Sequence, residues 1–330
     1  MKIFLDFEKP IEELELKIEE LRQLRGTNGN GPDDEIAALE QRLMELRKEI
    51  FLGLNPWQKC LLARHPERPY TLDYIERITS EFVELHGDRR YADDPAIIAG
   101  FGVIENTAMM IAGHQKGRGT KNRIMRNFGQ PHPEGYRKAL RVMKLAERFN
   151  LPIITFVDTP GAFPGIGAEE RGQSEAIATN LMEIFSITVP IISIVIGEGG
   201  SGGALALSVA DRLVMLEHSV YSVISPEGCT AILWSSERSS NQEDFSRAAS
   251  ALKLTASDLL GFGVIDAIIE EPRGGAHRDP AEAAANVKKY IIGAIEALRG
   301  MPTHELLEAR HQKFRNIGVY AETSGQVFQR

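Results

Sequence analysis

The stretch that decides the fold runs from Ile191 to Leu207 and reads IISIVIGEGGSGGALAL. Residues 191–196 predict a buried strand, and a turn with five glycines follows before an apolar helix begins. The first N–H groups of a helix lack intrahelical partners, and the helix dipole adds partial positive charge there. The turn therefore predicts a place where main-chain N–H groups bind an anion, or an oxygen that becomes negative.

Two phosphate-binding motifs overlap this turn but fit it poorly. GxGxxG occurs at Gly197, Gly199 and Gly202, but only about nine residues separate the turn from the next apolar run, fewer than the ~10–12 of a crossover helix. A P-loop requires lysine after the last glycine of its motif, and Gly203 occupies that position. The sequence DTPG at residues 158–161 resembles a GTPase switch motif, but without a lysine to meet the phosphates neither loop predicts a nucleoside triphosphatase.

A serine hydrolase is a second functional hypothesis, because Gly199, Ser201 and Gly203 form GxSxG. That chemistry needs a histidine downstream of the serine, oriented by an acid. The available histidines, none in a convincing motif, are His218, His277, His304 and His311. We therefore favour Ser201 as a small residue that fits a tight turn.

A second glycine-rich loop makes the first one part of a larger unit. Residues 151–157 (LPIITFV) predict another buried strand, and the loop DTPGAFPGIG follows at 158–167. Between the two loops, apolar residues recur at helical spacing at Ala176, Ile177, Leu181, Ile184 and Phe185. The order strand, loop, helix, strand predicts a parallel, right-handed unit. Both loops should then emerge at the carboxyl ends of neighbouring strands, where open α/β sheets bind ligands.

Three regions follow from the remaining pattern. Residues 1–51 predict an antiparallel helical hairpin, because apolar residues at three-four spacing run along two segments joined by the glycine-rich stretch 26–32. The apolar positions are Ile11, Leu14, Ile18, Leu21, Ile36, Leu39, Leu43, Leu46 and Ile50. Residues 52–300 form the expected catalytic domain, and 301–330 a helix and tail, frayed from 317. The hairpin could pack on itself, clasp a partner subunit, or serve a non-catalytic scaffold.

Further elements are expected within the second and third regions. Strands are predicted at 96–104, 109–113, 213–216, 220–224 and 264–269. Helices are predicted from Thr255 to Gly261, at 280–298 and at 303–314.

Composition predicts a cytoplasmic enzyme subunit. The chain has 330 residues, 43% hydrophobic and 25% charged, with a net charge of −8, which disfavours nucleic acid as the primary ligand. Cys60 and Cys229 are too few for a structural zinc site or a disulfide framework. No signal peptide is evident in residues 1–10 and no apolar run approaches ~20 residues, so we expect neither export nor membrane spanning.

Two charged features are ambiguous. A basic run without acids between Gly113 and Gly129 could meet the phosphates of a coenzyme A or an acidic partner, or could be a solvated loop. The run comprises Lys116, Arg118, Lys121, Arg123 and Arg126. Lys144 lies in VMKL (142–145), which is close to the Met-Lys-Met turn of biotin carriers, but its apolar neighbours predict a helix. We therefore expect Lys144 not to be biotinylated.

Longer strings resemble the carboxyltransferase alpha-subunit family of bacterial acetyl-CoA carboxylases. The strings are RHPERPYTLDY (64–74), GDRRYADD (87–94), GHQKG (113–117), DTPGAFPG (158–165), AEERGQSEAIA (168–178), GEGGSGGA (197–204) and YSVISPEGC (221–229). The likeness extends from about residue 4 to about residue 315.

The resemblance implies an α/β fold of the crotonase-like (ClpP/crotonase) type, a spiral of ββα units. It implies transfer of the carboxyl group from carboxybiotin on the biotin carboxyl carrier protein to acetyl-CoA, giving malonyl-CoA for fatty acid synthesis. It also implies a biotin carboxylase that supplies the carboxybiotin. A separate beta subunit would carry a zinc ribbon and most acetyl-CoA contacts, with an expected α2β2 assembly. No covalently bound cofactor and no metal are expected on this chain.

The expected site lies at the two glycine loops. The N–H groups of Gly202 and Gly203 are predicted to stabilise negative charge on the urea oxygen as the carboxyl group leaves biotin, because the family's oxyanion pair falls there. The ureate could then take the α-proton of acetyl-CoA, so no strong acid–base constellation of side chains is expected. The predicted substrate-binding residues, which could instead only shape turns or the core, are Gly161, Ala162, Phe163, Gly199 and Gly200. Phe163 replaces a tyrosine common in relatives.

Overall fold

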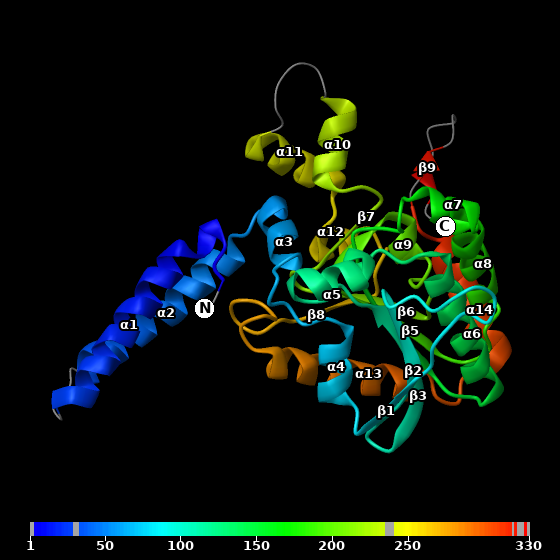
Figure 1. Cartoon of the computed structure of the whole chain (residues 1–330), viewed down its shortest axis with the longest axis horizontal. Coiled ribbons are helices and arrows are strands. Elements are labelled where there is room, and N and C mark those ends of the chain that lie inside the picture. Colours follow the sequence, from blue (N-terminus) through cyan, green and yellow to red (C-terminus); the bar gives the residue numbers. More distant parts are fainter. Residues whose placement is uncertain (1–2, 29–32, 235–240, 319, 322–326, 329–330) are drawn as a thin grey trace.

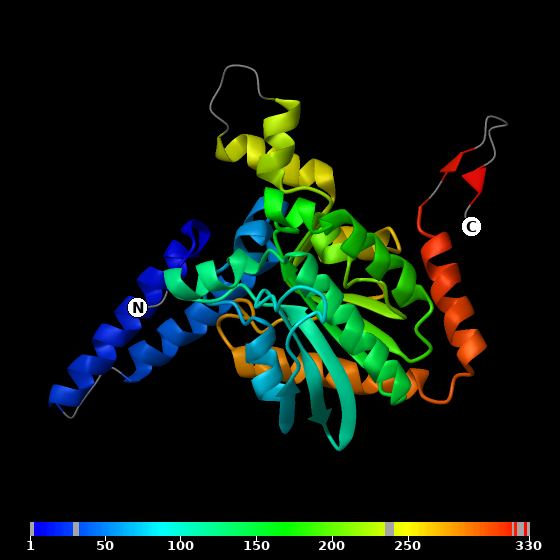
Figure 2. The same ribbon diagram turned by 45° about the vertical axis from the view of Figure 1, so that its right-hand side comes forward.

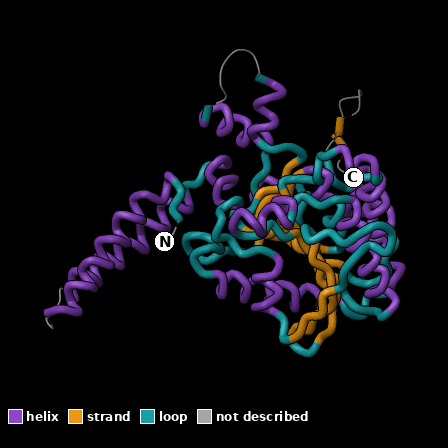
Figure 3. Tube along the Cα trace, in the orientation of Figure 1, coloured by secondary structure: helices purple, strands orange, loops and turns teal. Residues whose placement is uncertain are grey.

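A large mixed sheet with helices on both faces forms the body of the molecule, and a helical hairpin projects from it (Figure 1). The structure is a computed structural model that describes residues 3–28, 33–234, 241–318, 320–321 and 327–328. Figure 3 shows the strands of this sheet running from the middle of the molecule to its lower edge, with helices on either side.

The sheet has the strand order β1-β2-β3-β4-β5-β6-β8, with β7 beside β5. The β1–β2 and β2–β3 pairs are antiparallel, and the other pairs of this sheet are parallel. The strands are β1 (Glu81–Glu84), β2 (Ile97–Ile104), β3 (Thr107–His114), β4 (Ile153–Thr159), β5 (Ile191–Gly200), β6 (Arg212–Leu216), β7 (Val220–Ser222) and β8 (Ala267–Ile269). Two short strands, β9 (Tyr320–Ala321) and β10 (Val327–Phe328), pair separately.

The helices follow the spacing of apolar residues and their caps. They are η1 (Asp6–Glu8), α1 (Lys9–Asn28), α2 (Asp33–Leu52), α3 (Pro56–Ala63), α4 (Thr71–Ile78), α5 (Gly119–Met125), η2 (Asn127–Gly129), α6 (Pro133–Arg148), α7 (Ile166–Glu170), α8 (Gln173–Phe185), α9 (Ser201–Leu205), α10 (Pro226–Leu233), α11 (Gln242–Leu252), α12 (Ala256–Gly261), α13 (Pro280–Leu298) and α14 (Thr303–Arg315). Prolines open α3, α6, α10 and α13, where a missing N–H costs no hydrogen bond. Thr255 caps α12 as the sequence predicts.

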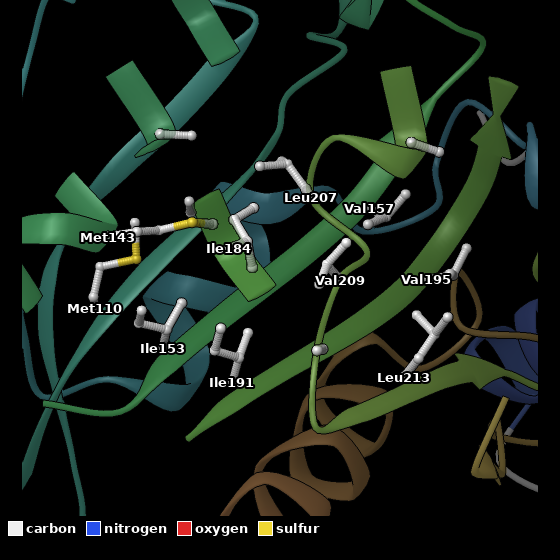
Figure 4. Close-up of a cluster of buried hydrophobic side chains, with 14 of the residues drawn as sticks. Met110, Met143, Ile153, Val157, Ile184, Ile191, Val195, Leu207, Val209 and Leu213 are labelled. Carbon is white, nitrogen blue, oxygen red and sulfur yellow. The ribbon is translucent and has the colours of Figure 1, made fainter. Parts of the chain in front are cut away.

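Alternate residues of each central strand face opposite layers of helices. On one face Ile97 and Ala99 pack with Val142 of α6 and Ile184 of α8, in the cluster that Figure 4 draws. On the other face Ile98 and its neighbours pack against α4 and α13, drawn in blue and orange in Figure 2. The period-two pattern therefore buries both faces, which explains why these strands read as continuous apolar runs.

The glycine turn after Ile196 is shorter than the sequence predicts. β5 continues to Gly200, because Glu198, Gly199 and Gly200 pair with β7 at Val220–Ser222. The following helix, α9, has five residues. The prediction that the strand ends at residue 196 was wrong, since strand pairing overrides the local preference of glycine for turns.

The N-terminal hairpin has the predicted form. α1 and α2 pack through Ile11, Ile18, Ile36 and Leu43, all buried. The joining residues 29–32 lie outside the described part of the chain. The boundary at residue 51 stays a prediction.

A buried arginine ties the C-terminal helix to the body. The Arg310 guanidinium pairs with Asp211 at 2.8 Å and donates to the carbonyls of Ile187 (2.6 Å) and Val189 (3.1 Å). Beyond α14, the prediction of a frayed end was wrong for β9 and β10, which pair antiparallel. The rest of that prediction, at residues 319, 322–326 and 329–330, lies outside the described residues. No helix in the described ranges is long and apolar enough to cross a membrane.

Candidate functional site

The two glycine loops meet at one edge of the sheet. β4 and β5 are parallel, with Ile153 opposite Ile191, so their carboxyl ends lie side by side as predicted. A Cβ atom on Gly203 would lie 2.6 Å from the nitrogen of Ala162 and 2.7 Å from the carbonyl carbon of Gly161. The contact between the loops is therefore main chain against main chain, which glycine permits.

Unpaired main-chain donors lie at this contact. Among the residues that the structure describes, the N–H groups of Gly202 and Gly203 donate no hydrogen bond. Gly203 is buried and Gly202 half-buried. Two unpaired donors on adjacent residues suit an oxygen that gains negative charge.

The predicted substrate-binding residues are brought together only in part. Gly161 and Ala162 contact Gly203. Gly199 pairs with Thr159 at the end of β5, and a Cβ on Gly200 would clash with the Pro160 carbonyl oxygen, so both also lie against the second loop. Phe163 turns elsewhere, because its ring packs on His132 with centroids 4.2 Å apart.

Ser201 has the backbone of an elbow but no described base. Its φ of +52° is unusual for a side chain other than glycine, and the residue is exposed. A hollow of about 280 Å³ beside it is lined by apolar side chains that include Leu205, Tyr221 and Val223, with no histidine. No histidine in the described residues hydrogen bonds to Ser201, so the geometry gives a nucleophile no partner.

A network of charged side chains lies beside the loops, and sequence reasoning missed it. Lys116 Nζ lies 2.6 Å from Asp158 Oδ1 and 3.6 Å from Glu198 Oε2. Arg64 pairs with Glu198 at 2.7 Å and with Glu227 at 2.5 Å. The sequence offered one signal, since an aspartate directly follows a buried strand and a glutamate lies within the glycine turn.

The network keeps its cations charged. Burial lowers the pKa of Lys116, but the carboxylates of Asp158 and Glu198 outweigh it, so the net shift is upward. Burial also lowers the pKa of Arg64, and Glu198 and Glu227 outweigh it in the same way. Asp158 further accepts the Glu198 N–H at 2.9 Å, which fixes the glycine turn to the end of β4. The network therefore holds the loops and does not present a neutral base.

The basic run divides into paired and free cations. Lys116 belongs to the network, and Arg118 pairs with Asp73 at 2.7 Å. Arg126 donates to the carbonyl of Pro95 at 2.7 Å. Lys121 and Arg123 are exposed, and neither has an ion pair among the described residues. Within the basic run, Lys121 and Arg123 are therefore the residues left for the predicted contact with an anion.

A second polar cluster, at the base of the hairpin, has the residue types of a metal site. Ligand atoms of Glu8, His65 and His277 lie within 4.8 Å of one another, and all three residues are buried. However, the two imidazole rings stack with centroids 4.0 Å apart, an arrangement in which both cannot point at one ion. Arg278 already binds the Glu8 carboxylate at 2.8 Å. The cluster therefore serves as a link between hairpin and body.

Solved structures share the fold at low sequence identity. The transcarboxylase 12S structure superposes with a TM-score of 0.56 at 20% identity, covering 70% of this chain and 41% of that chain. The beta subunit of P. aeruginosa geranyl-CoA carboxylase gives 0.52 at 17% identity, with 74% and 45% covered. The predicted crotonase-like α/β fold is confirmed.

Sequence comparison gives the family. The family model described as acetyl co-enzyme A carboxylase carboxyltransferase-like matches residues 4–318. Proteins named acetyl-coenzyme A carboxylase carboxyl transferase subunit alpha are 54% identical in Xanthomonas campestris (317 residues; 96% of this chain, 98% of that one) and 56% in Vibrio vulnificus (318 residues; 96% and 98%). The Thermus thermophilus protein of that name is 52% identical over 318 residues (96% and 99%). The chain belongs to the family of acetyl-CoA carboxylase carboxyl transferase alpha subunits.

Proposed function

We propose that this chain is the alpha subunit of a carboxyltransferase that moves a carboxyl group from carboxybiotin to acetyl-CoA, forming malonyl-CoA for fatty acid synthesis. Family membership over nearly the whole chain supports the reaction class. The observation that carries the site is the pair of unpaired N–H groups at Gly202 and Gly203, of which Gly203 packs on Gly161 and Ala162.

The chemistry requires stabilisation of one developing charge. When the bond between the carboxyl carbon and the biotin nitrogen breaks, negative charge develops on the urea oxygen. The Gly202 and Gly203 N–H groups would donate to that oxygen, and they are preorganised because the loops are locked together. The ureate would accept the α-proton of acetyl-CoA, and the resulting carbon nucleophile would take up the carboxyl group.

The partners follow from the same proposal. A beta subunit would bring zinc and most acetyl-CoA contacts, in an α2β2 assembly in the cytoplasm. A biotin carboxyl carrier protein would deliver carboxybiotin made by a biotin carboxylase, and this chain would hold no metal and no covalent cofactor. The hairpin is proposed to clasp the beta subunit. Deleting residues 1–50 should then abolish co-purification, and unaltered assembly would refute the clasp.

The test measures malonyl-CoA formation from carboxybiotin and acetyl-CoA with this chain and the beta subunit, each alone and mixed. Activity in the mixture alone supports a shared site. Inactivity of a folded, associated mixture would refute the proposal. Ser201→Ala distinguishes the carboxyltransferase from the hydrolase hypothesis. Activity should survive this change if Ser201 only shapes a turn and should be lost if Ser201 is a nucleophile.

A further inference from the structure

A small exposed surface beside the site combines apolar side chains with the two free cations. It comprises Lys121, Arg123, Ile124, Met125 and Phe128, hereafter the Phe128 patch. The three apolar side chains are each about half or more exposed, at 59%, 49% and 54%. α5 buries none of its residues, and Figure 1 shows it at the front of the molecule. None of the residues that the structure describes covers the patch.

The backbone under Phe128 is held in a strained form. Asn127 (φ +49°), Phe128 (φ +55°) and Gly129 (φ +78°) are consecutive residues in the left-handed region. A bulky residue seldom adopts this conformation unless its surroundings impose it, and such strain is concentrated at functional sites. In this conformation Phe128 stays about half exposed.

Contacts with neighbouring residues hold residues 127–129 in this conformation. Arg126 donates to Pro95 O at 2.7 Å, and Asn127 Nδ2 donates to Asp94 Oδ1 at 3.3 Å. A Cβ on Gly129 would lie 2.5 Å from Lys116 Cγ, so the loop packs tightly on the residue that pairs with Asp158. The patch is thus rigidly mounted on the network that holds the glycine loops.

The same loop reaches the second glycine loop. The carbonyl of Pro131, two residues after Gly129, accepts the Phe163 N–H at 3.0 Å and the Gln173 side chain at 2.8 Å. A molecule seated on the Phe128 patch would therefore lie beside both glycine loops without filling them.

We propose that the Phe128 patch is the docking surface for the protein that carries carboxybiotin, through a face that presents carboxylates around an apolar side chain. This inference rests on the proposed function. Charge complementarity requires a negatively charged surface on the partner. No acid occurs between Gly113 and Gly129, and neither Lys121 nor Arg123 is paired in the described residues. The apolar centre favours a protein over a phosphate group. A few apolar contacts with charges at the rim suit a partner that must arrive quickly and leave.

The test compares carboxybiotin attached to the carrier with free carboxybiotin, using the complex with the beta subunit. Phe128→Ala and the double variant Lys121→Glu/Arg123→Glu should each raise the KM for the carrier about tenfold or more. Turnover of free carboxybiotin and the KM for acetyl-CoA should stay unchanged. The matched control is Lys289→Glu, which reverses an exposed cation on α13 and should change neither KM.

Three results would overturn the inference. A raised KM for acetyl-CoA would assign the cations to coenzyme phosphates, and loss of co-purification would assign the patch to the beta subunit. An unchanged KM for the carrier would leave the patch without this role. Titrating fluorescent carrier onto the complex measures binding without turnover. If the wild-type complex made no malonyl-CoA, the proposed function would fail. Weaker binding of the carrier by the variants would still support the docking surface in that case.

Discussion

The glycine-loop edge and the N-terminal hairpin are held together in different ways. At the edge, main chain contacts main chain, as where Gly203 packs on Gly161 and Ala162. In the hairpin, a seam of side chains such as Leu43 is flanked by ion pairs in water. An added methyl group at Gly203 would have no room, whereas solvent can replace an exposed ion pair that is lost from the hairpin. The edge should therefore be sensitive to single atoms and the hairpin tolerant of them.

The largest expected effect compares two neighbouring glycines. In Gly203→Ala the new Cβ would lie 2.6 Å from Ala162 N, so the main chain must shift and the donors lose their alignment. We expect kcat to fall by about 10²–10³, as for loss of an oxyanion-hole donor.

Gly202→Ala is the matched control. Its Cβ would meet only Ile177, at 3.6 and 3.8 Å, which is ordinary contact, and its N–H remains. Malonyl-CoA formation by this variant should stay within a few fold of wild type. Equal loss in both variants would mean that the steric difference between the two positions does not matter.

The next effect tests the charge network at the edge. Lys116→Met leaves the buried Asp158 carboxylate without its cation. The free energy of unfolding should fall by about 2–3 kcal/mol, below the 3–5 kcal/mol of a fully buried pair because the Lys116 side chain is 15% exposed. Urea denaturation measures this loss. If the double variant Lys116→Met/Asp158→Leu were no more stable than the single one, the unpaired charge would not be the cause.

The third prediction concerns pH and His114, a buried residue whose ring accepts the Asp158 N–H at 3.3 Å. Burial lowers the pKa of His114 from 6.5 to about 3. Between these values the unfolded histidine binds a proton that the folded one does not, so stability falls as pH drops below about 6.5. At pH 5 the slope from this group is about 1.4 kcal/mol per pH unit.

His114→Gln removes the titrating group and keeps an acceptor for the Asp158 N–H. In urea denaturation at pH 7, 6 and 5, the free energy of unfolding of this variant should fall less steeply with decreasing pH than that of wild type. At pH 5 the difference in slope should be about 1.4 kcal/mol per pH unit. A variant that lost stability with the same pH dependence as wild type would contradict the assignment.

The smallest effect belongs to the hairpin. Arg22 and Glu40 lie 2.5 Å apart, but their side chains are 58% and 44% exposed. Arg22→Ala should cost at most about 0.5 kcal/mol, because solvent and salt screen such pairs. Arg47→Ala should cost more, since its pair with Glu15 is largely buried. Thermal unfolding of both variants at low and high salt would measure these losses of stability. A loss above about 1 kcal/mol for Arg22→Ala would contradict the contrast between the two regions.

Local pattern predicted what depends on neighbours in the chain. The apolar run before Gly197 gave a central strand, and the strand-loop-helix-strand order gave the meeting of both glycine loops. The extension of β5 to Gly200 was not predictable, because it depends on pairing with β7. The pairing of Lys116 with Asp158 was missed for a similar reason: each residue alone reads as part of a loop, and only the fold brings them to one edge.

The anchoring of Arg310 has a consequence for how the protein is made. Asp211, its carboxylate partner, precedes it by 99 residues, and Arg310 lies close to the C-terminus. A ribosome adding about 5–20 residues per second needs on the order of 5–20 s to cover that interval. While β6, β7, β8 and α13 are being made, the nascent chain therefore carries a carboxylate whose guanidinium has not yet been made. The last turns of α14 are what complete the body, and a transcript truncated before codon 310 should yield a product that quality-control proteases recognise.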